Sequence, residues 1–104
     1  MNKIKDLRSK INEIDKKLLD LIIERLQVVR EIGREKSKKG IGIIDKNREQ
    51  EIFKKLIGQA EKQEIDPEII RKIWKMLMKL SYEIEASSEL DQGAVGEGGK
   101  NGNS

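Results

Sequence analysis

The stretch KIKDLRSKINEIDKKLLDLIIERLQVVREIGREKSK, from Lys3 to Lys38, decides the fold of this chain. Its large apolar residues recur at alternating steps of three and four, which is typical of a helix that packs along one narrow seam. The seam consists of Ile4, Leu7, Ile11, Ile14, Leu18, Leu21, Val28 and Ile32. No proline interrupts the stretch, so we expect one helix of roughly 50 Å. Such a helix is longer than a compact domain of this size and cannot cover its own seam.

Three charged residues on this helix need an explanation. Arg25 holds a seam position between Leu21 and Val28, where an apolar residue is expected. Lys36 follows on nearly the same face, roughly 16 Å away, whereas Arg8 lies roughly 25 Å before Arg25. Arg8 can therefore approach Arg25 only from a second, antiparallel helix. The plain alternative is that Arg8 and Lys36 are solvated and that Arg25 sets the register of a coiled coil.

Composition limits both the core and the chemistry. Of the 104 residues, 39% are charged and 3% are aromatic, so the chain forms one domain at most and has little material for a monomeric core. Oligomerisation is the expected remedy. His and Cys do not occur, which excludes Ser-His and Cys-His nucleophiles and the usual zinc and haem ligands. Carboxylate-only metal sites stay open as an alternative, but we expect no metal and no cofactor, and catalysis by positioning and electrostatics.

The charge pattern bears on partners and location. Charges of both signs alternate along the predicted helix, as in Asp6 with Lys10. The net charge of +3 therefore forms no basic stripe, and we expect no nucleic-acid partner. No apolar run is long enough to span a bilayer, and the apolar region of a signal peptide is missing. We expect no membrane association and a cytoplasmic location.

Two shorter helices are expected after the loop SKKGIGII at 37–44, where two glycines break the helical period. The second helix lies within 45–63 and has Asp45 as its N-cap, and Asp66 with Pro67 opens the third helix. From about Ser88 the composition changes, and the closing segment DQGAVGEGGKNGNS at 91–104 is Gly-rich. The prediction is an all-α domain over residues 1–87, followed by a disordered tail at 88–104.

The two shorter helices also carry polar residues that are candidates for a binding site. In the first turn of the second helix, Glu49 suits the positive end of the helix dipole, whereas Arg48 has the wrong sign there. A cation at that place is explained if it binds an anion. Near the end of the third helix, Ser81 and Glu85 are four residues apart and share one face.

Taken together, these features resemble the all-helical (AroQ-type) chorismate mutases. The resemblance rests on the pattern L-R-x-x-I-x-x-I-D-x-x-L-L-x-L-I-x-E-R from Leu7 to Arg25, on Lys36, and on D-x-x-R-E at 45–49, and it covers residues 4–87 without gaps. It implies three helices, one very long, that form an intertwined homodimeric bundle. It also implies two equivalent sites for chorismate, each built from both chains, and the conversion of chorismate to prephenate in the biosynthesis of phenylalanine and tyrosine.

The same resemblance implies a role for each polar residue of the site. Arg25 and the partner subunit's Arg8 would clamp the two carboxylates of chorismate, a task that suits the bidentate guanidinium group. Lys36 would reach a carboxylate and the ether oxygen of the breaking bond, and Glu85 would contact that oxygen from the other side. The remaining substrate contacts would be Asp45 and Glu49 at the ring hydroxyl, with Arg48 and Ser81 completing the polar lining.

Glu85 departs from the commoner family pattern, in which Gln, a neutral donor, holds this position. A carboxyl group can donate to the ether oxygen only when it is protonated. Two alternatives to the mutase stay open at this point. One is isochorismate-pyruvate lyase, an enzyme on the same fold, and the other is a non-catalytic helical dimerisation module.

Overall fold

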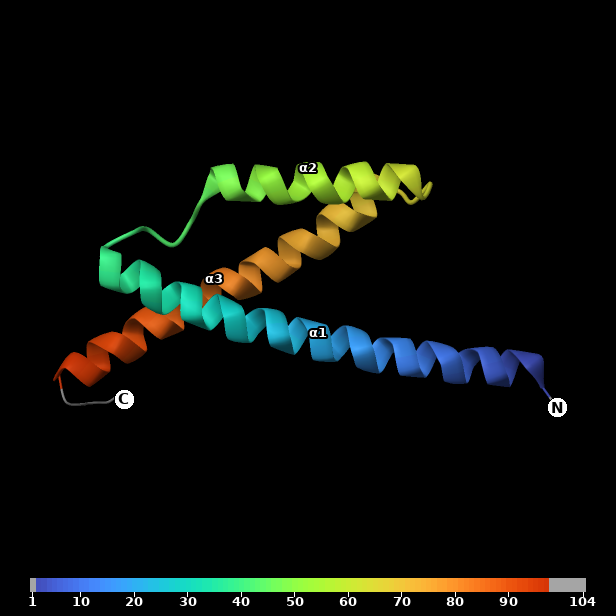
Figure 1. Ribbon diagram of the computed structural model, residues 1–104, viewed down its shortest axis with the longest axis horizontal. Coiled ribbons are helices and arrows are strands. Elements are labelled where there is room, and N and C mark those ends of the chain that lie inside the picture. The colour runs from blue at the N-terminus through green and yellow to red at the C-terminus, as the bar shows by residue number, and fades with distance from the viewer. Residues whose placement is uncertain (1, 98–104) are drawn as a thin grey trace.

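The computed structural model describes residues 2–97, and their side chains as far as residue 87 (Figure 1). It contains the helices α1 (Lys3–Lys39), α2 (Lys46–Lys62) and α3 (Pro67–Glu97), and the described range contains no strand. The predicted all-α class and the three predicted helices are therefore confirmed. None of these helices combines the length and apolar character needed to cross a membrane within the described residues.

The helices begin at the capping residues that the sequence contains. Asn2 caps α1, because its Oδ1 accepts hydrogen bonds from the N–H groups of Ile4 and Lys5. Asp45 Oδ1 accepts from the Arg48 N–H at 3.0 Å, and Asp66 Oδ1 accepts from the Glu68 N–H at 2.9 Å. Both predicted N-caps are therefore confirmed.

The carboxyl end of α1 depends on one glycine. Gly40 has φ +67°, in the left-handed region that disfavours other residues. Its N–H and that of Ile41 bond back to the carbonyls of Ser37 and Lys36. This cap stops α1 and turns the chain into the loop that leads to α2.

The last helix runs further than the sequence indicates. Helix α3 continues to Glu97, ten residues past the expected boundary at residue 87. The residues that directly follow this boundary, SELDQ at 88–92, lack glycine and proline, so nothing in the backbone stops the helix there. Residues 98–104 of the predicted tail lie outside the described residues, and the boundary between a domain and a tail stays a prediction.

Helix α3 joins the other two helices, because it packs against both α1 and α2 (Figure 1). The amino-terminal half of α1 projects away from α2 and α3. The molecule measures 61 × 34 × 16 Å and has a radius of gyration of 18.4 Å, whereas a compact chain of this length would have about 13 Å. A single copy of the chain is therefore extended and not compact.

The buried core of the single chain is small and lies toward the carboxyl end of α1. Among the described side chains, the buried apolar residues are Val29, Ala60 and Met78, and two polar residues, Ser81 and Glu85, are equally buried. The seam of α1 is not covered, since the exposed fractions of its side chains run from 43% at Ile32 to 60% at Ile4. The single chain thus buries a polar site better than it buries its longest apolar surface.

Candidate active site

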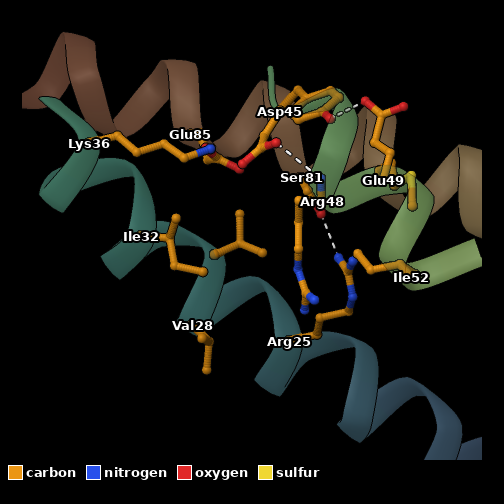
Figure 2. Close-up of a pocket in the computed structure, with 13 residues that line it drawn as sticks. Arg25, Val28, Ile32, Lys36, Asp45, Arg48, Glu49, Ile52, Ser81 and Glu85 are labelled. Atoms are coloured by element: carbon orange, nitrogen blue, oxygen red, sulfur yellow. Dashed lines mark hydrogen bonds and ion pairs between the residues drawn. The ribbon is translucent and has the colours of Figure 1, made fainter. Parts of the chain in front are cut away.

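A cavity of about 520 Å³ lies where the three helices meet (Figure 2). Helix α1 supplies one wall, the cap and first turns of α2 supply the second, and the middle of α3 supplies the third. The lining residues are Arg25, Val28, Val29, Ile32, Lys36, Asp45, Arg48, Glu49, Ile52, Met78, Ser81, Tyr82 and Glu85.

At one end of the cavity, α1 and α3 are joined by a salt bridge. Lys36 Nζ lies 2.8 Å from Glu85 Oε1, and both side chains are largely buried, with exposed fractions of 18% and 7%. Lys36 Nζ also donates to the Ile43 carbonyl at 2.7 Å. The ammonium group is thereby fixed between a helix and the loop that precedes α2, and it faces the cavity (Figure 2).

Near the middle of the cavity, Arg25 is held by a buried hydroxyl. Arg25 Nη1 donates to Ser81 Oγ, and Ser81 donates its own proton to the Leu77 carbonyl at 2.8 Å. Since a hydroxyl has one proton, Ser81 faces Arg25 as an acceptor. Ser81 therefore orients the guanidinium group of Arg25 in this arrangement.

A second guanidinium group shares the cavity with Arg25. Burial, and then the positive charge of Arg48, lower the pKa of Arg25 from its ordinary value. Among the described residues Arg25 has no salt bridge, and the pair of Arg48 with Glu51 is exposed and 3.4 Å long. Two cations that face one space and lack strong acidic partners favour an anionic ligand with more than one negative group.

At the opposite wall, the start of α2 presents two acids. Asp45 is engaged as the N-cap of α2. Glu49 is mostly buried, with 19% of its side chain exposed, and its Oε2 accepts a hydrogen bond from the Tyr82 hydroxyl of α3. The cavity thus has Arg25 and Lys36 on the α1 wall and Arg48 beside Asp45 and Glu49 on the α2 wall, so it offers cations for carboxylates together with acceptors for a hydroxyl.

Of the eight residues that the sequence assigns to the site, seven line this cavity. Arg8 does not, because it is exposed on the projecting half of α1. Its separation of seventeen residues from Arg25 along a continuous helix corresponds to roughly 25 Å.

The pattern of this chain matches the model of one protein family, chorismate mutase type II, over residues 7–86. The chain belongs to this family. The matched range includes all three walls of the cavity and also Arg8.

Named relatives agree with this assignment. The chorismate mutase of Methanocaldococcus jannaschii is 33% identical, over 76% of this chain and 80% of that protein. The T-proteins of Enterobacter agglomerans and Haemophilus influenzae are 36% and 33% identical, over 84% and 79% of this chain. The chain spans 22% of the length of each T-protein.

In this chorismate mutase family member, the sequence alone misses part of the cavity lining. Val28 and Ile32 belong to the seam by spacing, yet they also line the cavity. Tyr82 gives no strong signal either, although it directly follows Ser81 and precedes Glu85 by three residues, which places it on a neighbouring face of α3. No group of three or more Asp and Glu residues suited to a metal ion occurs in the described part of the chain.

Proposed function

We propose that this chain is a chorismate mutase, an isomerase that converts chorismate to prephenate in aromatic amino-acid biosynthesis. The observation that carries the proposal is the cavity itself, in which Arg25 and Lys36 of α1 line the same space as Arg48, Asp45 and Glu49 at the start of α2. Chorismate has two carboxylates and a ring hydroxyl, so its polarity matches that of the cavity.

The reaction requires no group that the chain lacks. It is a unimolecular rearrangement in which negative charge develops on the ether oxygen as its bond to the ring lengthens. The protein therefore needs to hold the flexible enolpyruvyl arm in the reactive conformation and to place positive charge or hydrogen-bond donors beside that oxygen. Arg25, oriented by Ser81, serves the first task, and Lys36 serves the second.

Lys36 suits charge stabilisation because its position is fixed before the substrate binds. Glu85 and the Ile43 carbonyl hold its ammonium group at 2.8 and 2.7 Å. A preorganised donor of this kind needs little reorganisation when the charge develops. Glu85 accepts from Lys36 in the structure, and it would become a second donor to the ether oxygen only on gaining a proton.

The complete site requires a second copy of the chain. Arg8 is too far from Arg25 to act within the same copy, whereas an antiparallel pairing of two α1 helices brings the partner subunit's Arg8 toward the cavity. The exposed seam supports this pairing, since covering a half-exposed Ile or Leu contributes on the order of 1 kcal/mol. We therefore propose an intertwined homodimer with two sites shared between the chains.

The experiment that tests the function is the loss of chorismate absorbance on addition of purified protein, with prephenate identified as the product. Arg25→Ala should abolish turnover while the protein stays folded. Arg34→Ala is the matched control, because Arg34 is an exposed arginine of α1 that does not line the cavity. Absence of turnover from acid to neutral pH would contradict the proposal.

The family model and the names of the relatives favour the mutase over the two alternatives. A lyase would release pyruvate from isochorismate, which a direct assay detects. A dimerisation module would explain the seam but not the orientation of Arg25 by a buried hydroxyl. The cytoplasmic location expected from the sequence stays a prediction.

A further inference from the structure

Tyr82 connects the α3 wall of the cavity with the α2 wall. It is the single tyrosine of the sequence, it is half-buried on α3, and it lines the cavity. Its hydroxyl donates a hydrogen bond to Glu49 Oε2 on α2. It also has a hydrogen bond with the backbone of Asp45, the cap residue of α2. One phenol group thus ties α3 to the start of α2, through the carboxylate of Glu49 and the backbone of Asp45.

This contact leaves Glu49 with one oxygen for a ligand. Oε2 is engaged by Tyr82, and the remaining contact of Oε1 is an ion pair with Lys46 at 3.7 Å. That pair is loose, since 77% of the Lys46 side chain is exposed, and exposed pairs of this kind contribute little. Since Glu49 lines the cavity, Oε1 is the oxygen of this carboxylate that is left to accept from a ligand.

We propose that Tyr82 is a positioning residue, which holds the Glu49 carboxylate so that its free oxygen accepts the ring hydroxyl of the substrate. The inference rests on the proposed function. It adds Tyr82, to which the family resemblance assigns no role, and it assigns the two oxygens of Glu49 to different partners.

The electrostatic surroundings of Tyr82 are consistent with this role. Burial, the hydrogen bond to Glu49 and the Glu49 charge raise the pKa of Tyr82 to about 12; the charge of Glu85 also raises it, and the Asp45 backbone opposes the shift. The phenol is thus protonated throughout the neutral range. It can serve as a constant donor to Glu49 at every pH at which the enzyme would work.

The first test compares the steady-state kinetics of Tyr82→Phe with those of the wild type. Loss of the phenol proton should raise KM for chorismate roughly three- to tenfold, the value of one hydrogen bond, with kcat within about twofold. The ring hydroxyl neither loses a bond nor gains charge in the rearrangement, so the effect should be mainly on binding. Lys46→Gln is the control, because it removes the exposed partner of the same carboxylate, and its KM should stay within about twofold. An unchanged KM in Tyr82→Phe overturns the proposal, and so does a fall in kcat at constant KM.

The second test does not depend on turnover. The near-ultraviolet absorbance of the phenolate reports Tyr82 alone, because the chain has no other tyrosine. Its titration midpoint, about 12 in the wild type, should fall in Glu49→Gln, which removes the charge that disfavours the phenolate. A midpoint that does not move overturns the contact. A wild-type protein without mutase turnover overturns the proposed function and the role at the ring hydroxyl, whereas the titration still reports whether Tyr82 and Glu49 interact.

Discussion

Replacing Lys36 by alanine should damage catalysis and stability together, and the structure lets the two effects be separated. Lys36 is the salt-bridge partner of Glu85, and both side chains are largely buried. Removing the lysine leaves a buried carboxylate without its cation. Breaking a buried pair costs 3–5 kcal/mol in fully enclosed sites, and for this pair, which borders a cavity, we expect a loss of about 2–4 kcal/mol in the free energy of unfolding.

The catalytic loss has a different origin. Removing one preorganised donor from a developing oxyanion costs roughly 2.7–4 kcal/mol of barrier, which corresponds to a fall in kcat of about a hundredfold to a thousandfold. The double variant Lys36→Ala with Glu85→Gln distinguishes the two losses. The neutral amide removes the unpaired charge, so stability should recover in large part, whereas kcat should stay low.

The assay measures kcat at saturating chorismate and urea unfolding at one fixed protomer concentration, since the stability of a dimer depends on concentration. Lys38→Ala is the matched control, because Lys38 is 64% exposed and has only an i,i+3 pair with Glu35 at 3.5 Å. It should change neither quantity beyond about 0.5 kcal/mol. A folded Lys36→Ala protein with near wild-type kcat would refute the role of Lys36.

Two further outcomes are expected. Leu18→Glu places a charge in the middle of the exposed seam and should yield monomers without mutase activity, as seen by sedimentation; a stable dimer would exclude the proposed pairing. The pKa of Tyr82 is raised from 10.0 to about 12 in the folded protein, so the unfolded chain should release the phenol proton at lower pH than the folded chain. The stability contributed by Tyr82 should therefore be complete below pH 10 and fall as the pH rises toward 12. Unfolding experiments on Tyr82→Phe should lack this part of the pH dependence.

Local rules of sequence predicted the helices well. The seam spacing and the absence of proline gave the length of α1 to within one residue, and Asp45 and Asp66 marked the starts of α2 and α3. These features depend on residues close in sequence, which is why periodicity and capping chemistry detect them. The extent of α3 was less predictable, because isolated glycines weaken a helix without fixing the point where it ends.

The site was predictable in its members but not in their mutual contacts. The polar residues that interrupt an apolar pattern or oppose a helix dipole, such as Arg25 and Arg48, were identifiable from their positions. The contacts of Arg25 with Ser81 and of Tyr82 with Glu49 join residues 56 and 33 positions apart. Such contacts follow from how α3 crosses the other helices, and no local pattern in the sequence specifies them.

The central claim is that each mutase site takes Arg25 from one chain and Arg8 from the other. The most direct test mixes inactive Arg8→Ala and Arg25→Ala proteins under conditions that allow the subunits to exchange. Each mixed dimer has one site with both arginines and one site with neither, so an equal mixture should regain about a quarter of the wild-type activity. A mixture as inactive as its two components, although mixed dimers form, would contradict the shared site.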